Sequence, residues 1–144
     1  METGRDGVIV VDVNIVVPLF LDRPTTPIVR RLSEDEGDWR LPSLWRAEFL
    51  NILSSYNKFM GIPKIKAQEI WAQVNRLDLI HVEPVDHVWA LELSMDKKLS
   101  GYDALYAALA LKLDCPFVTY DEKLRKALPG VAASPEEYIK TLRK

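Results

Sequence analysis

The chain has 144 residues, of which 48% are hydrophobic and 28% are charged. This length suits one globular domain with its own core better than two, and we expect residues 1–144 to form a single domain. The net charge of −2 excludes a broadly basic nucleic-acid binder, although a metal ion can supply the positive charge that a phosphate requires. The single cysteine, Cys115, excludes an intramolecular disulfide and a zinc site built from cysteines.

Signals for export or membrane insertion do not stand out in the sequence. Residues 1–6 are polar and acidic, which does not fit a signal peptide. The longest apolar run, over residues 104–111, falls far short of the roughly 20 residues that a membrane helix requires. We therefore expect a cytoplasmic protein that does not contact a membrane.

Short apolar runs at intervals along the chain predict β-strands. Residues 8–11 form a continuous β-branched run, which is typical of a central strand covered on both faces. Further strands are expected over residues 39–42, 79–82, 116–119 and 131–133.

Helical patterns separate these strands. The clearest lies over residues 43–56, where apolar side chains recur at helical spacing from Trp45 to Tyr56. In the helix expected over residues 64–77, Ile65 is counted among the side chains that face the interior. Other helices are expected over residues 14–21, 26–34, 84–97, 104–113 and 121–128, and a last one begins at Ser134.

This alternation of short buried strands and helices predicts an α/β fold of three layers, with a short central parallel sheet flanked by helices. In such sheets, ligands gather beyond the carboxyl ends of the strands. Asp12 and Asp121 each follow a predicted strand, so we expect both side chains at this edge of the sheet.

Four acidic side chains are candidate functional residues, and each also has a purely structural explanation. Asp12 and Asp121 could cap the helices that follow them. Asp103 fits, with Ser100, the Ser-x-x-acid pattern that starts a helix. Glu48 lies beside the apolar face of its helix and has no basic neighbour one turn away, so it either extends to water or converges on other groups.

Together these acids predict a shared metal site. Like charges that lie close together repel strongly unless a cation lies between them. Oxygen ligands suit Mg²⁺ or Mn²⁺, whereas zinc would favour histidine or thiolate. The glycines form neither a dinucleotide loop nor a Walker loop, and no serine or cysteine lies in a nucleophile motif. Basic residues such as Lys123 and Arg125 could hold a phosphate backbone or form only a solvated face.

Four segments of the chain resemble, in order, the four motifs of PIN domains, and most closely those of VapC-type toxins from prokaryotic toxin–antitoxin pairs. These segments are residues 10–14 (VVDVN), 42–53 (PSLWRAEFLNIL), 102–110 (YDALYAALA) and 118–124 (VTYDEKL). Each motif alone is loose, but four in this order at these separations are specific. The resemblance covers about residues 8–142.

The resemblance implies a three-layer PIN-like domain and a Mg²⁺- or Mn²⁺-dependent endoribonuclease. On this likeness the family's acidic quartet corresponds to Asp12, Glu48, Asp103 and Asp121. Asn14 and Thr119 match polar positions that help to hold the site. One or two metal ions would activate a water molecule for hydrolysis of an RNA phosphodiester.

The resemblance also implies two protein partners, a second copy of the chain in a homodimer and a cognate antitoxin that blocks the site. Two alternatives remain open from the residues themselves. The same acidic site could serve a metal-dependent phosphatase or DNA nuclease, or the acids could merely cap helices in a non-catalytic binding module.

Overall fold

A five-stranded parallel sheet forms the centre of the fold. The computed structural model describes residues 7–142. The strand order is β3-β2-β1-β4-β5, and all neighbouring strands run parallel. The strands are β1 (Val8–Val11), β2 (Asp38–Leu41), β3 (Ile80–Val82), β4 (Phe117–Val118) and β5 (Ala132–Ala133). The expected short parallel sheet is therefore confirmed.

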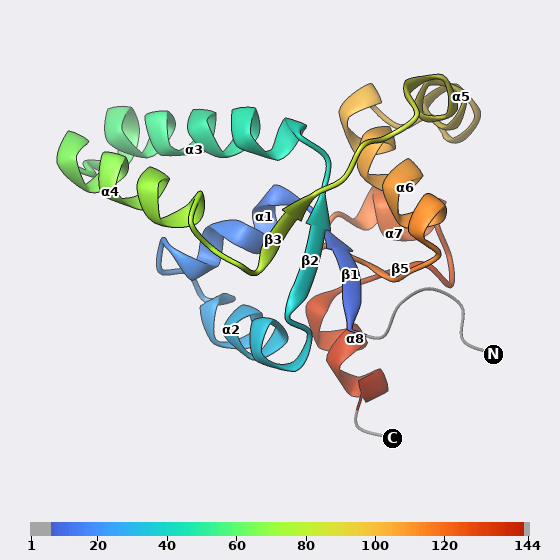
Figure 1. Cartoon of the computed structure of the whole chain (residues 1–144), viewed down its shortest axis with the longest axis horizontal. Coiled ribbons are helices and arrows are strands. Elements are labelled where there is room, and N and C mark those ends of the chain that lie inside the picture. The colour runs from blue at the N-terminus through green and yellow to red at the C-terminus, as the bar shows by residue number, and fades with distance from the viewer. Residues whose placement is uncertain (1–6, 143–144) are drawn as a thin grey trace.

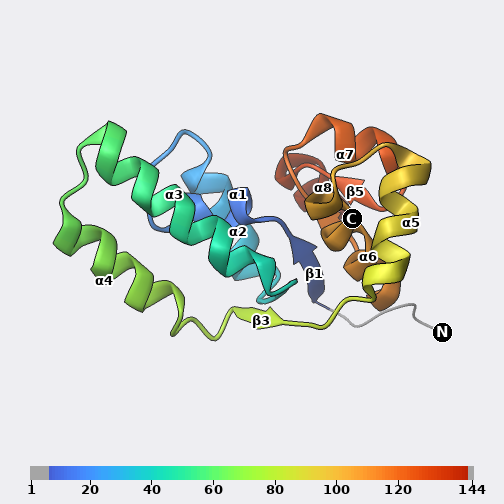
Figure 2. The same cartoon turned by 90° about the horizontal axis from the view of Figure 1, so that it is seen from above.

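Helices cover both faces of this sheet. They are α1 (Val13–Val16), the 3-10 helix η1 (Val17–Leu19), α2 (Thr26–Asp35), α3 (Leu44–Met60), α4 (Lys64–Val74), α5 (His87–Lys97), α6 (Gly101–Leu113), α7 (Glu122–Ala127) and α8 (Pro135–Leu142). Figures 1 and 2 show α3 and α4 on one side of β1 and α5 and α6 on the other, which confirms the three-layer α/β architecture. None of the helices in residues 7–142 has the length and apolar character to cross a membrane.

The core forms where both helical layers meet the sheet. All four residues of β1 are buried, as expected for a strand between β2 and β4. The largest fully buried side chains include Trp39 of β2, Trp45 and Phe49 of α3, Tyr106 of α6 and Phe117 of β4. Burial of one large apolar side chain contributes about 1.5–3 kcal/mol, so these contacts hold the elements around the site in place.

The α3–α4 hairpin differs from the expectation in two respects. Helix α3 continues past Tyr56 to Met60 and ends at Gly61, whose φ of 78° lies in the left-handed region that glycine adopts without strain. The prediction that Ile65 faces inward is wrong, because this side chain is 67% exposed while Ile70 and Val74 are buried. Five residues of helix rotate Ile65 about 140° away from Ile70, and Ile65 lies in the first turn of α4, at the outer end of the hairpin (Figure 1).

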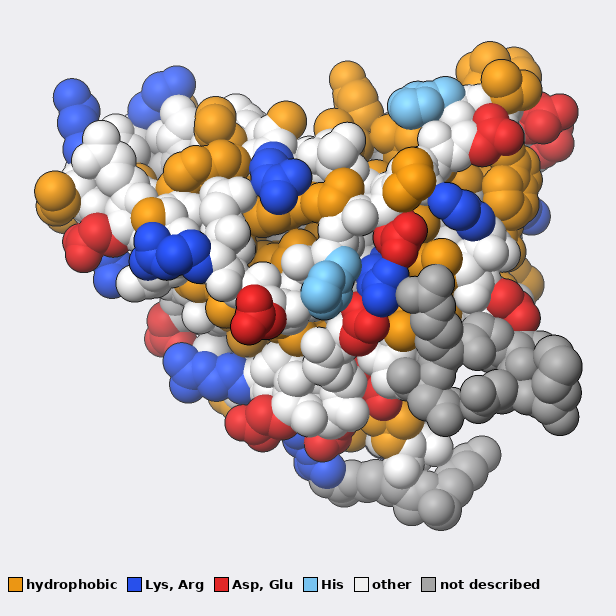
Figure 3. Space-filling view, in the orientation of Figure 1, with side chains coloured by type: hydrophobic (Ala, Val, Ile, Leu, Met, Phe, Trp, Pro, Cys, Tyr) orange, Lys and Arg blue, Asp and Glu red, His pale blue; other side chains and the backbone are white. Residues whose placement is uncertain are grey.

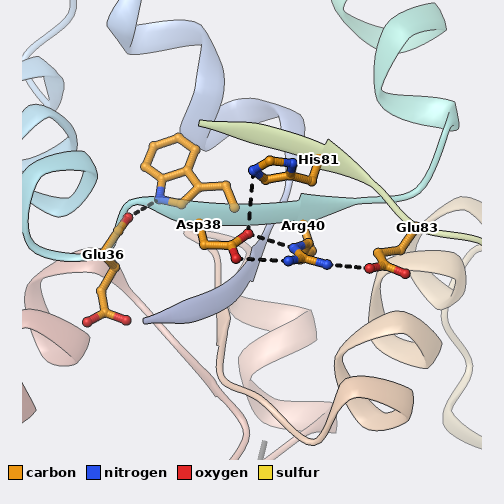
Figure 4. A network of polar contacts seen from close by, with 6 residues as sticks. Glu36, Asp38, Arg40, His81 and Glu83 are labelled. Carbon is orange, nitrogen blue, oxygen red and sulfur yellow. Dashed lines mark hydrogen bonds and ion pairs between the residues drawn. The ribbon is translucent and has the colours of Figure 1, made fainter. Parts of the chain in front are cut away.

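A polar network joins β2 to the end of β3 at one edge of the sheet (Figure 4). Arg40 donates hydrogen bonds of 2.6 and 2.8 Å to Asp38 and one more to Glu83. His81 Nε2 lies 3.8 Å from Asp38 Oδ1. The Arg40 side chain is only 13% exposed, so these carboxylates compensate a largely buried cation.

Candidate active site

The candidate site lies at the carboxyl ends of β1 and β4, which are neighbours in the sheet. From β1 the strand order runs to β2 and β3 on one side and to β4 and β5 on the other. Such a reversal of strand order opens a crevice in which α/β proteins bind their ligands. Asp12 follows β1 and Asp121 follows β4, so both lie at this reversal.

Asp12 is a buried carboxylate with two different oxygens. Its Oδ2 accepts a hydrogen bond from the Thr119 hydroxyl, whereas its Oδ1 is buried and has no hydrogen-bond partner. The side chain makes no capping hydrogen bond of normal geometry to α1, although the backbone N–H groups of Asn14 and Ile15 lie near enough to lower its pKa. Burial, with a smaller contribution from the charge of Glu48, raises the pKa of Asp12 to about 7, although the hydrogen bond from Thr119 opposes this rise.

Thr119 connects the ends of the two strands. Its hydroxyl donates to Asp12 and accepts a 3.0 Å hydrogen bond from the backbone N–H of Asp121. The Asp121 side chain is exposed, and its Oδ1 caps α7 by accepting from the N–H of Leu124 over 3.0 Å. One Asp121 oxygen thus has the structural role that the sequence suggested, and its other oxygen forms no hydrogen bond within residues 7–142.

Glu48 faces α6 across the crevice. It is half-buried, and its Oε1 accepts a 2.5 Å hydrogen bond from the hydroxyl of Tyr106, a buried side chain of α6. Burial raises the pKa of Glu48, the charge of Asp103 adds to this, and the bond from Tyr106 opposes it. Glu48 therefore points toward the other acids and does not extend into water.

Asp103 lies in the first turn of α6. Ser100 caps this helix by accepting a 3.0 Å hydrogen bond from the Asp103 backbone N–H, and its side chain also interacts with the Asp103 carboxylate. Burial raises the pKa of Asp103 and the charge of Asp121 raises it further, whereas the side-chain hydrogen bond with Ser100 and the charge of Lys123 lower it.

The four expected acids thus gather at one crevice. Electrostatic contacts run from Asp12 to Glu48, from Glu48 to Asp103 and from Asp103 to Asp121. These side chains come from four separate segments of the chain, and each contact raises the pKa of a carboxyl. A cation between the acids would relieve this repulsion.

A pocket of about 410 Å³ opens beside Asp12. Its lining includes the expected Asn14, which is exposed, together with Asp12 and Asp121. The rest of the lining comes from the turn that contains Arg23 and from Tyr120, neither of which the sequence analysis assigned to the site.

These residues fit a hard divalent cation. They offer carboxylate oxygens, and the orphaned Asp12 Oδ1 lacks the partner that a buried carboxylate oxygen requires. Within residues 7–142, no group of three or more His, Cys, Asp or Glu side chains is close enough to form a metal cage by itself. Mg²⁺ is commonly held by one or two carboxylates with water and substrate phosphates, so an open arrangement of this kind suits it.

Tyr106 and Arg23 are the contributors that the sequence did not reveal. Tyr106 follows Asp103 by one helical turn in a segment that otherwise consists of alanine and leucine. This spacing was the only sign in the sequence that Tyr106 lies near the acids. Its bond to Glu48, 58 residues away, depends on how α3 and α6 face each other. Arg23 lies in a turn without any periodic pattern.

Known proteins share this fold. The crystal structure of PAE2754 from Pyrobaculum aerophilum matches with a TM-score of 0.66 and 21% identity over 93% of this chain and 95% of that chain. A toxin–antitoxin complex from Klebsiella pneumoniae matches with a TM-score of 0.63 and 18% identity over 88% of this chain and 96% of that chain. No curated protein sequence matches this one.

A comparison with protein families identifies the fold by sequence as well. The family model of the PIN domain matches residues 9–127, which include all four acids and most of the chain. The chain therefore belongs to the PIN-domain family.

Proposed function

We propose that this protein is a Mg²⁺-dependent endoribonuclease that hydrolyses RNA phosphodiester bonds at the acidic crevice of a single domain. The observation that carries the proposal is the buried, unpartnered oxygen of Asp12 at a crevice where three further acids gather. PIN domains are generally nucleases, which supports a reaction at a phosphodiester. Oxygen donors favour Mg²⁺, or Mn²⁺ in its place, over zinc.

In this proposal Asp12, Glu48, Asp103 and Asp121 are the catalytic and metal-binding side chains. A bound Mg²⁺ would supply Lewis acidity and an activated water molecule. Asp12 offers its unpartnered Oδ1, and the Thr119 hydroxyl fixes the orientation of its carboxylate. A bound cation would lower the pKa of Asp12 and favour its ionised carboxylate at neutral pH.

Other side chains support this group. Tyr106 donates a hydrogen bond to one oxygen of Glu48, which leaves the other oxygen available to a ligand. Asn14 lines the pocket beside Asp12, where its polar side chain can contact the RNA strand that binds there. These contacts keep the acids oriented before substrate arrives, which lowers the cost of assembling the site.

The direct test is cleavage of RNA with Mg²⁺ and with EDTA. We expect cleavage only with the metal, and at least about a hundredfold loss in Asp12→Asn and Asp103→Asn, because each removes a negative ligand. Asp96→Asn is the matched control, since this exposed aspartate on α5 lies outside the pocket, and it should cleave as the wild type does. Circular dichroism would check that all variants fold.

Three outcomes would count against the proposal. Wild-type rates in both Asp12→Asn and Asp103→Asn would remove the catalytic assignment. Cleavage of single-stranded DNA with intact RNA would favour the DNA-nuclease alternative. RNA binding without any cleavage would favour the non-catalytic module.

We also propose that the protein is the cytoplasmic toxin of a type II toxin–antitoxin pair. The similar structure from Klebsiella pneumoniae is a toxin–antitoxin complex, which supports such a partner. An apolar hollow of about 230 Å³ between α3 and α4, lined by residues such as Leu50, Leu53 and Trp71, suits an antitoxin segment that inserts an apolar side chain. Inhibition of cleavage by the product of a small neighbouring reading frame would support this pairing.

The second proposed partner is another copy of the chain. Val88, Leu91 and Met95 form an exposed apolar stripe along α5. Figure 3 shows hydrophobic side chains gathered over α5 and, separately, over α3 and α4. An exposed apolar stripe on one helix can pack against its own copy about a twofold axis, so we propose that it forms a homodimer.

A further inference from the structure

Arg23 lines the same pocket as Asp12 and Asp121. It lies in the turn between η1 and α2, where its backbone N–H donates to the Thr26 hydroxyl over 2.9 Å. Thr26 is buried and donates onward to the carbonyl oxygen of Pro18 over 2.8 Å. The backbone of the turn is therefore fixed, and it places Arg23 beside the acids.

Tyr56 of α3 holds the Arg23 side chain. Arg23 Nε donates to the Tyr56 hydroxyl over 2.9 Å, and Nη2 donates to the same oxygen. The guanidinium carbon lies 5.5 Å from the centre of the Tyr56 ring, within the range of a cation–π interaction. Because a single hydroxyl accepts both bonds, Nη1 and one N–H of Nη2 remain available to a ligand.

The charge of Arg23 also lacks a counterion in the part of the chain that the structure describes. No carboxylate there forms an ion pair with Arg23, whereas Arg40, another partly buried arginine, is paired with Asp38 and Glu83. A partly buried cation is expensive without a compensating anion. An oriented, uncompensated guanidinium on a pocket wall therefore suits an anionic ligand.

We propose that Arg23 binds a phosphate of the RNA strand next to the phosphodiester that is cleaved, and that Tyr56 positions it. This inference rests on the proposed nuclease function. The planar fork of a guanidinium matches two phosphate oxygens, which an ammonium group does not. The acids accept a phosphate only with a cation between them, whereas Arg23 carries its charge permanently, so its contribution to RNA binding persists without metal.

The test is binding of a fluorescein-labelled single-stranded RNA to the full chain, measured by fluorescence anisotropy in EDTA at several salt concentrations. Arg23→Ala should weaken binding roughly tenfold, the value of one charge-assisted hydrogen-bonded contact. The slope of log Kd against log salt should fall by about 0.7, as expected for one lost phosphate contact on a single strand. Arg30→Ala, at an exposed position of α2, is the control and should change neither quantity.

Two further variants separate charge from geometry. Arg23→Lys should keep the salt slope but bind severalfold more weakly, because the charge remains and the fork is lost. Tyr56→Phe should also keep the salt slope and bind RNA severalfold more weakly, since it removes the hydrogen bonds that orient the guanidinium but not the charge of Arg23. If Arg23→Ala fails to fold, Arg23→Lys and Tyr56→Phe still test the proposal.

The outcomes distinguish this inference from the proposed function. Wild-type Kd and salt slope in Arg23→Ala would overturn it, as would an absence of RNA binding by the wild type. If the wild type cleaves RNA with Mg²⁺ while Arg23→Ala binds normally, only the Arg23 inference fails. If no RNA is cleaved but binding depends on Arg23, the inference stands and the nuclease proposal fails.

Discussion

The two oxygens of Asp12 meet different surroundings, since one accepts a bond from Thr119 and the other is buried without a partner. This asymmetry has a consequence for stability. The native pKa of about 7 lies above the ordinary value of 3.8, so the folded protein holds the Asp12 proton more tightly than the unfolded chain does. The free energy of unfolding therefore contains a contribution that is fully favourable below pH 4 and is lost as pH rises toward 7.

Asp12→Asn should remove this dependence. In EDTA, we expect the variant to be more stable than the wild type, and its advantage at pH 8 should exceed that at pH 5 by roughly 2–3 kcal/mol. Urea denaturation at the two pH values measures this difference. Added Mg²⁺ at pH 8 should then stabilise the wild type more than Asp12→Asn, because the ion binds the folded site.

The control for this experiment is Asp96→Asn, which removes an exposed carboxylate on α5. Its stability relative to the wild type should be the same at both pH values. A parallel pH dependence in wild type and Asp12→Asn would show that Asp12 is ionised without penalty in the fold, and the electrostatic account of the crevice would then be wrong.

At the scale of elements, hydrophobic periodicity was enough to predict the sheet and its helices. The β-branched run of β1 predicted a buried central strand, and the apolar spacing in α3 predicted a helix with Trp45 and Phe49 inside. Ile65 was misplaced because its helix extends beyond the sheet, where no layer covers it. Periodicity describes one element at a time and carries no information about where the neighbouring layer ends.

The residues of the candidate site also fall into those that the sequence could place and those that it could not. Asp12 and Asp121 could be placed at one edge because parallel strands end together. The bond from Tyr106 to Glu48 and the position of Arg23 against Tyr56 could not be predicted, since each joins segments whose mutual orientation depends on the packing of the whole domain. Glu48 and Asp103 were grouped with the two strand-end acids because neither has a local cation and a shared metal ion would compensate all four, and the resemblance to the PIN family points to the same residues.

The β2–β3 edge offers a prediction at this scale. Arg40→Ala should lower the free energy of unfolding by about 1–3 kcal/mol, because a largely buried cation that bonds two carboxylates is lost and those carboxylates then repel. Arg31→Ala is the matched control, since Arg31 forms an exposed pair with Asp35 on α2 and should cost less than about 0.5 kcal/mol. Urea unfolding of both variants measures the contrast. Equal losses would mean that the network in Figure 4 adds no more than a surface pair does.

At the scale of the whole molecule, two apolar surfaces remain uncovered on opposite sides of the sheet (Figures 1 and 3). The surface on α5 is a stripe, whereas Leu50 belongs to the hollow between α3 and α4. Monomeric proteins rarely leave such patches exposed, and their separation allows two partners to bind at the same time. This geometry suits a toxin that forms a dimer through one side and receives an antitoxin on the other.

The assignment of these surfaces can be tested with two matched substitutions. Light scattering should give the mass of a dimer for the wild type and of a monomer for Leu91→Glu, because a charge in the centre of a self-packed apolar stripe is costly to bury. Leu50→Glu places the same charge on a leucine of nearly equal exposure in the α3–α4 hollow, and it should remain a dimer. If Leu50→Glu alone became a monomer, the dimer would form through the hollow, and the antitoxin would have to bind elsewhere. A monomeric wild type would remove the homodimer from the proposed function and leave the acidic crevice, which is built within one chain, unaffected.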